Sequence, residues 1–296
     1  MDSRSVHHSD YCCKLFIGSD GKMKNLTLCL LSVIISTVVW GGDVHQSKIK
    51  DIQQFFDKDS CDQVLKDTFT ICYSHKRKSA KAVYVKIYGD KVEKDIAKRP
   101  GFWTDKRISK KYQTKSGDYT NTGYDRGHFG ASDASHDHDK KNQKATYSMA
   151  NIVPQTPRAN RYKFVALERH ERNMAIEHGS LHVVSLAFWN AEPKTIGKSK
   201  LQVPSAFAKI FTCTTHGYRE CFFVWNTDVY DKGKGANPNT YKVDCNKVIA
   251  MWETNVGSVD SWSPQDSKEL KRLLKKLGGQ VPKTANHTKM MLKMVP

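Results

Sequence analysis

Apolar and polar positions divide the middle of the chain into short strand-like runs and one long helical run. A stretch without a helix breaker begins at Thr156, a capping residue, and Pro157, which suits the first helical position, and it stops at Gly179. This pattern predicts an α+β domain over residues 55–280 with a mixed or antiparallel sheet core. Five segments rich in β-branched and aromatic residues predict its strands, at 69–75, 82–88, 146–153, 181–189 and 221–230.

The N-terminal part of the chain has a different pattern. Residues 26–39 form an apolar run that follows Lys24 and precedes small residues, which is the layout of a secretory signal. Residues 23–42 are therefore predicted to be a signal peptide. The apolar run is short for a membrane span, although an uncleaved signal anchor stays open as the alternative. Met23 is favoured as the true start, which would leave residues 1–22 as an upstream tail outside the translated protein.

The C-terminal part predicts a second helix at 263–279 and a basic tail at 281–296. With the signal removed, no stable membrane insertion is expected, and the protein is predicted to be periplasmic or secreted.

Export affects how the cysteines are interpreted, because an oxidising compartment allows disulfides. Short separations favour pairing Cys61 with Cys72 and Cys213 with Cys221, the second across a predicted hairpin at 211–223. Cys245 is then left over. No CxxC spacing occurs, which argues against a structural zinc site.

The charge balance indicates the kind of partner. The chain has 48 Lys and Arg against 30 Asp and Glu, a formal net charge of +18. Such an excess attracts polyanions, first of all nucleic acid or an anionic membrane. A solvated, lysine-rich surface is the plain alternative, and an aromatic content of 10% excludes a disordered basic tail protein.

Polar groups suited to phosphate chemistry gather in one block of the chain. A hairpin carrying His128 feeds the long helix, so His128 is expected to face the first turns of that helix. In chain order, the block contains Asp125, Arg126, His128, Asn151, Gln155, Asn160, Glu168 and Arg172.

The helical spacing suggests a metal site. Asn160 and Glu168 are eight residues apart, which in a regular helix is about 80° of rotation and about 12 Å of rise. Because side chains lean toward the helix N-terminus, Asn160 can hold a cation directly while Glu168 reaches it through a bound water. Arg172 follows Glu168 by four residues and can steady it. A hard oxygen site with few protein ligands suits Mg²⁺, with Mn²⁺ or another divalent cation as the alternative.

Three stretches, "DRGH", "MANIVPQTPRAN" and "ALERHER", resemble motifs of the DNA/RNA non-specific endonuclease family, a ββα-metal group. The resemblance is centred on residues 123–172, and weaker similarity runs over 65–255 and includes "RPGFWTD", "LHVV" and "VPSAFAK". The resemblance implies a ββα-metal finger active site and hydrolysis of DNA and RNA. The polar stretch "FGASDASHDHDKKN" reads as an insertion, which leaves the loop over the site open, and its His136 and His138 are interpreted as solvated.

The resemblance also implies roles for single residues. His128 matches the general base, Asn160 the one direct protein ligand of Mg²⁺, and Glu168 the residue that holds the metal's waters. Asn151 is expected to support His128 or the leaving side, and Asp125 to be structural.

Three arginines are similar to the family's phosphate clamps. Arg126 and Arg172 match most directly, and Arg99 is a third candidate, for which a turn packed by Trp103 is the alternative. The planar guanidinium matches phosphate oxygens, and a neutral imidazole suits a base at neutral pH. Gly127 is expected to let the backbone turn tightly between Arg126 and His128.

These observations predict an exported, Mg²⁺-dependent endonuclease that cuts DNA and RNA with little sequence specificity. A non-catalytic extracellular nucleic-acid-binding protein on the same fold, for example in DNA uptake, is the second hypothesis, and a phosphodiesterase or phosphatase for small substrates is a third. A homodimer and an inhibitor protein stay open as partners.

Overall fold

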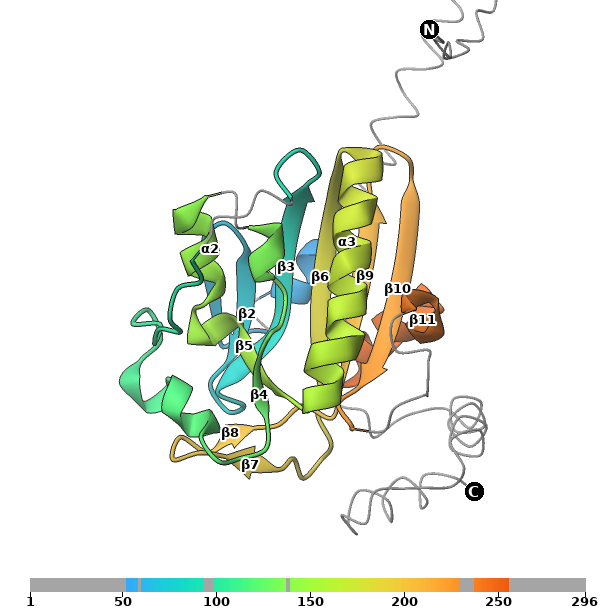
Figure 1. Ribbon diagram of the computed structural model, residues 1–296. Helices are drawn as coiled ribbons and strands as arrows, with labels where there is room; N and C mark the ends of the chain where they lie inside the picture. The colour runs from blue at the N-terminus through green and yellow to red at the C-terminus, as the bar shows by residue number, and fades with distance from the viewer. Residues whose placement is uncertain (1–51, 58–59, 93–97, 137–138, 229–236, 256–296) are drawn as a thin grey trace, which may run out of the picture. The chain divides into compact units, whose positions relative to one another are not determined.

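The computed structural model describes residues 52–57, 60–92, 98–136, 139–228 and 237–255 (Figure 1). The predicted signal peptide, the upstream tail, the second helix at 263–279 and the basic tail at 281–296 lie outside the described residues. Within the described ranges, no helix has the length and apolar character that a membrane span requires.

A seven-stranded sheet forms the centre of the fold, and every pair of neighbouring strands in it is antiparallel. This confirms the predicted α+β class with an antiparallel core. In spatial order the strands are β1 (Gln63–Lys66), β2 (Thr70–Ser74), β3 (Ser79–Tyr88), β6 (Ser180–Phe188), β9 (Ala206–Cys213), β10 (Tyr218–Trp225) and β11 (Lys242–Val243).

Smaller elements surround this sheet. Two further antiparallel pairs are β4 (Asp125–His128) with β5 (Ile152–Gln155), and β7 (Thr195–Ile196) with β8 (Leu201–Gln202). The α-helices are α2 (Lys140–Thr146), α3 (Val165–His178) and α4 (Cys245–Asn255), and a π-helix, η6 (Ala159–Phe164), precedes α3. Short 3₁₀ turns are η1 (Gln54–Phe56), η2 (Lys110–Tyr112), η3 (Ser116–Tyr119), η4 (Asp133–Ser135), η5 (Met149–Asn151) and η7 (Pro238–Tyr241).

Both faces of the sheet are buried. Val83 of β3 packs in the same cluster as Leu167 of α3, whereas its neighbour Ala82 packs in the cluster that contains Trp252 of α4. Figure 1 shows α3 lying in front of the sheet, with β4 and β5 on the same side. Since successive strand residues point to opposite faces, a sheet covered on both sides needs apolar residues at nearly every position. This explains the mostly apolar runs at 82–88 and 181–189, which only Lys86, His182 and Ser185 interrupt.

The strand predictions were confirmed in the sheet, except that the segment at 221–230 extends beyond the end of β10 at Trp225, and one prediction beside the sheet was partly wrong. The segments at 69–75, 82–88 and 181–189 correspond to β2, β3 and β6, and the predicted hairpin at 211–223 lies within β9 and β10. The segment at 146–153 is wrong in its first part, because only its end belongs to a strand, β5.

The long helix begins and ends as predicted but is not regular. The Thr156 hydroxyl accepts a hydrogen bond from the Ala159 amide at 3.3 Å, and Gly179 ends the helix at φ 78°, where a side chain would be strained. Between them, η6 has π-helical hydrogen bonding, which widens the turn. The angular offset between Asn160 and Glu168 in a regular α-helix therefore does not apply.

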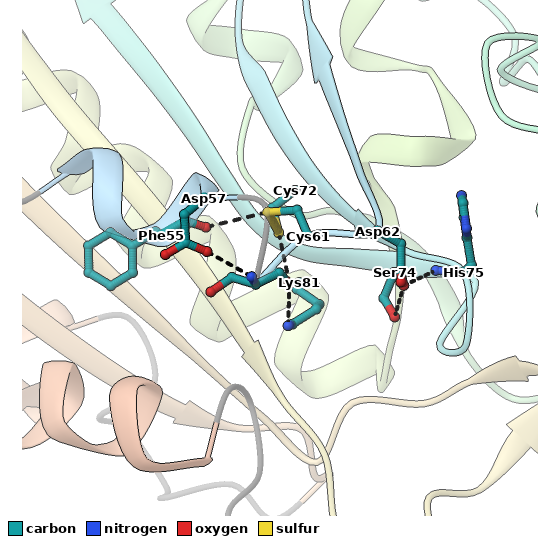
Figure 2. The surroundings of a disulfide bond; sticks show 9 residues. Phe55, Asp57, Cys61, Asp62, Cys72, Ser74, His75 and Lys81 are labelled. Atoms are coloured by element: carbon teal, nitrogen blue, oxygen red, sulfur yellow. Dashed lines mark hydrogen bonds between the residues drawn. A yellow bond between two sulfur atoms is a disulfide. The ribbon is translucent and has the colours of Figure 1, made fainter.

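One predicted disulfide is present. Cys61 and Cys72 are bonded with their Cα atoms 5.1 Å apart, which ties the segment before β1 to β2 (Figure 2). Polar contacts surround this bridge: Lys81 Nζ donates to the Ser60 carbonyl at 2.5 Å, and the Asp62 carboxylate accepts from the Ser74 hydroxyl at 3.1 Å.

The second predicted disulfide, Cys213 with Cys221, is wrong. Cys221 bonds instead to Cys245, which joins β10 to α4, and Cys213 stays free and buried. The strand register explains the difference, because Cys221 lies opposite Ile210, three residues before Cys213 on β9. An odd offset places two side chains on opposite faces of a sheet. Cys213 packs toward α3, whereas Cys221 packs in the cluster that contains Trp252.

Candidate active site

His128 ends β4 in an aromatic surrounding. Its ring meets Tyr147 edge-on at 4.8 Å between centroids, and Phe102 lies 6.1 Å away. The Nε2 atom is buried and has no hydrogen-bond partner among the described residues. A buried polar atom without a partner is costly, so such an atom is typical of a site that awaits a ligand or a water.

The surroundings keep the imidazole of His128 neutral. Burial lowers its pKa to about 3, and the positive charges of Arg99 and His136 act in the same direction. His136 is itself buried, with Nδ1 3.1 Å from the Ser132 carbonyl, so the prediction of a solvated His136 is wrong. His138 lies outside the described residues.

The lowered pKa of His128 can be measured directly. We expect the NMR chemical shifts of the His128 ring protons in the metal-free protein to stay constant between pH 8 and pH 5. An unperturbed histidine, in contrast, titrates with a pKa of about 6.5. Because the unfolded chain takes up this proton first, His128 should lower the free energy of unfolding as pH falls from about 6.5 toward 3. The resonance is assigned by its loss in His128→Gln. An inflection near the unperturbed value would contradict the burial argument.

Asn151 supports the chain that leaves His128. Its Oδ1 accepts from the amides of Gly130 and Ala131 at 3.2 and 3.3 Å, and its Nδ2 donates to the carbonyls of Ala131 and Thr146 at 2.8 and 2.9 Å. The side chain is fully buried. These four bonds use all the capacity of the amide, so Asn151 holds the loop after His128 rather than contacting a ligand.

Asp125 connects β4 to the helix that carries Asn160. Its carboxylate receives two hydrogen bonds from Arg161, both at 2.8 Å, and a third from Asn160 Nδ2 at 3.1 Å. Burial alone would raise the pKa of Asp125, but these hydrogen bonds hold the pKa below its usual value. Since Nδ2 is engaged, Oδ1 is the atom that Asn160 can offer to a cation. Asp125 was expected to be structural, and its hydrogen bond to Nδ2 orients the Asn160 side chain.

Glu168 lies near a second carboxylate that the sequence analysis did not single out. Burial raises the pKa of Glu168 to about 7, Lys209 and Arg172 oppose this, and Glu171 and Asp133 add to it. Asp133 in η4 also pairs with Arg99, with Nε to Oδ2 at 3.0 Å. Arg99 acts on the pKa of His128 and Asp133 on that of Glu168, so the Arg99–Asp133 pair lies between the two candidate site residues. Only the position of Asp133 five residues after His128 could have pointed to it.

The three candidate clamps differ in their surroundings. Arg126 donates from Nε and Nη2 to the Ser116 carbonyl at 3.0 and 2.8 Å and lies over the rings of Phe102 and Tyr119. Arg99 is 79% exposed and can meet a ligand from solvent. Arg172 is close enough to Glu168 to lower its pKa. The guanidinium of Arg126 is thus preorganised by a backbone carbonyl, while Arg99 is held by a carboxylate.

Gly127 has a different role from the one expected. It lies inside β4, paired with Val153, and its φ is not positive, so it makes no tight turn. A Cβ atom at this position would come within 2.2 Å of Gln155 Cδ. Glycine is needed because the Gln155 side chain crosses the strand there, with Nε2 3.4 Å from the His128 carbonyl.

A family model described as DNA/RNA non-specific endonuclease matches residues 52–258. The chain belongs to this family. The matched range contains β4, β5 and η6 and both disulfides, so it includes every residue of the candidate site.

This chain is similar to curated relatives that include mitochondrial endonuclease G from Homo sapiens and from Bos taurus. The chain is 24% identical to the first over 163 residues and 24% identical to the second over 161 residues. Each alignment covers 51% of this chain and 54% of the relative, so the chain spans about half the length of the curated relatives it matches. A solved EndoG/EndoGI complex contains a chain with a TM-score of 0.56 and 21% identity, covering 62% of this chain and 81% of that chain. This likeness supports the fold.

Proposed function

We propose that the chain is a divalent-cation-dependent endonuclease that hydrolyses phosphodiester bonds of DNA and RNA with little sequence specificity. The observation that carries this proposal is the unpartnered Nε2 atom of the neutral His128 ring, near Arg99, which forms an ion pair with Asp133. A phosphodiester is attacked by water only if a base takes the proton and positive charge offsets the phosphate. The surroundings of His128 offer both.

The residues fit a hard cation. Asn160 can present Oδ1 and Glu168 a carboxylate, which are the oxygen donors that Mg²⁺ prefers. Burial raises the pKa of Glu168 even though Lys209 and Arg172 lower it, and a bound cation would favour the ionised carboxylate further. When bound, Mg²⁺ would neutralise phosphoryl oxygens and assist the leaving alkoxide. Mn²⁺ has the same donor preference and stays an alternative.

The remaining steps fall to the chain's own side chains. His128 takes the proton of the attacking water at Nε2. The lowered pKa keeps the ring neutral before the step, and in the tautomer with the proton on Nδ1 the Nε2 atom is the acceptor. Arg126, Arg172 and Arg99 hold the phosphate, with Arg126 fixed in place by the Ser116 carbonyl. The net charge of +18 attracts the polymer through its backbone, which explains binding without sequence readout.

Export is part of the proposal. The signal-like pattern at 23–42 supports it, and the two disulfides are typical of an oxidising compartment such as the periplasm or the medium. An inhibitor protein is a further candidate partner, because the solved structural neighbour is a complex of EndoG with EndoGI.

The decisive experiment uses the mature chain from Asp43 with plasmid DNA and with structured RNA. We expect degradation of both substrates in Mg²⁺ and loss of both activities in EDTA, because the cation is needed to neutralise the phosphate. Gel electrophoresis over a time course measures the effect. Shortened fragments that appear before mononucleotides would identify internal cleavage. Retention of intact nucleic acid with and without Mg²⁺ would instead support the non-catalytic binding protein.

A further inference from the structure

Three side chains that commonly bind transition metals meet at the end of α3. His178 is the last residue of this helix, Cys213 ends β9, and His216 lies in the turn between β9 and β10. Cys213 Sγ is 3.4 Å from His216 Nδ1, and the ring centroids of His178 and His216 are 5.0 Å apart. One potential ligand atom from each residue lies within 4.8 Å of the other two.

We propose that His178, Cys213 and His216 form a binding site for a borderline-soft divalent cation of the Zn²⁺ type, which ties the end of α3 to the β9–β10 turn. One thiolate and two imidazoles are the donors that zinc prefers, and they leave a fourth position for water. This site is separate from the oxygen donors of Asn160 and Glu168 and does not depend on the proposed nuclease activity.

The distances suit a small tetrahedral ion. Zinc bonds of about 2.0–2.1 Å to nitrogen and about 2.3 Å to sulfur place neighbouring ligand atoms about 3.3–3.7 Å apart. The pair formed by Cys213 and His216 already has this separation. The ligand atoms of the two pairs that include His178 lie within 4.8 Å and need only small side-chain rotations, for which half-buried His178 and exposed His216 have room.

The state of Cys213 is the second observation. Four of the five cysteines after the predicted signal are in disulfides, while Cys213 is buried and free. Its neighbours are two imidazoles rather than a sixth thiol. The carbonyl end of α3 adds partial negative charge, which favours a cation at His178. A thiol with this surrounding is placed for metal binding rather than for a disulfide.

The site is remote from the candidate active site. His178 follows Glu168 by ten residues of the same helix, which is about 15 Å along the axis. Cys213 and His216 are three residues apart, as the two cysteines of a CxxC would be, whereas His178 precedes Cys213 by 35 residues. Only the packing of α3 against β9 and β10 brings His178 to the other two ligands.

The experiment uses the mature chain after removal of metal with EDTA, without a thiol reductant so that both disulfides survive. We expect one equivalent of Co²⁺ to produce a near-ultraviolet thiolate-to-cobalt charge-transfer band, which oxygen ligands do not produce. We expect Zn²⁺ to abolish this band by displacement and to raise the melting temperature, because a ligand of the folded state stabilises it.

The variants decide whether the cluster is responsible. Because Cys213 is buried and its replacement can disturb packing, the main variant is His216→Ala in the exposed turn, with Thr215→Ala as the matched control. Changing a group that only supports a ligand costs about 10–100-fold in affinity, so His216→Ala should bind Zn²⁺ at least about 10²-fold more weakly, while Thr215→Ala binds normally. A competing chromophoric chelator measures the affinity. No charge-transfer band, or an unchanged Zn²⁺ affinity in His216→Ala, would overturn the proposal.

Discussion

Replacing His128 with alanine is expected to lower kcat/KM for nucleic-acid cleavage by at least about 10²–10⁴-fold, which is the usual cost of losing a general base. The physical reason is that Nε2 of His128 is the neutral, unpartnered proton acceptor of the site. Initial rates with plasmid DNA, with and without added imidazole, provide the measurement. Imidazole should restore part of the rate, because it can occupy the space of the missing ring.

Two controls separate a lost base from a lost fold. His75→Ala removes a histidine that stacks on Tyr112 at 4.0 Å between ring centroids, outside the candidate site, and should leave cleavage unchanged. His128→Ala should still bind nucleic acid with the wild-type salt dependence, because the arginines and lysines that meet the backbone are intact. Cleavage within tenfold of wild type would show that His128 is not the base.

The second large effect concerns the ion pair between Lys209 of β9 and Glu171 of α3. Lys209 Nζ is 2.5 Å from Glu171 Oε1, and the two side chains are 1% and 0% exposed. Lys209 also lies 5.2 Å from the centre of the Phe164 ring. Lys209→Met should lower the free energy of unfolding by about 3–5 kcal/mol, because it leaves the Glu171 carboxylate buried without a counter-charge. Urea unfolding followed by fluorescence measures the change.

The double variant tests the cause. Lys209→Met together with Glu171→Leu removes both charges, and replacement of a whole buried pair by apolar groups is often neutral or stabilising. We therefore expect the double variant to recover most of the lost stability. If its loss equalled the sum of the two single losses, packing rather than charge would explain the effect. Lys209 also lowers the pKa of Glu168, so this pair connects the stability of α3 to the candidate site.

Features that depend on neighbours in the sequence were predicted well. Strands β2, β3 and β6, the cap at Thr156 and the stop at Gly179 follow from side-chain composition and backbone preference within a few residues. The strand prediction at 146–153 was wrong in its first part because local hydrogen bonds form a turn there. The Ser148 carbonyl accepts a hydrogen bond from the Asn151 amide at 2.8 Å, which closes a 3₁₀ turn. β-propensity gave way there to turn chemistry.

The candidate site divides in the same way. The sequence spacing was enough to predict that His128, Asn160 and Glu168 lie close together, because one hairpin and the helix that follows it carry all three. The involvement of Asp133 and the burial of His136 could not be predicted, since both residues lie in a polar stretch whose composition resembles a solvated loop. Their importance comes from contacts across elements, such as the pairing of Asp133 with Arg99.

By itself, the sequence determined the α+β class, the strands of the sheet and the order of the chemical groups, because periodicity, capping and motif spacing act over short distances along the chain. The tertiary structure alone decided which cysteine joins Cys221, why position 127 is glycine, and that His178 meets Cys213. Those contacts depend on strand register and helix packing, where an offset of one residue moves a side chain to the opposite face.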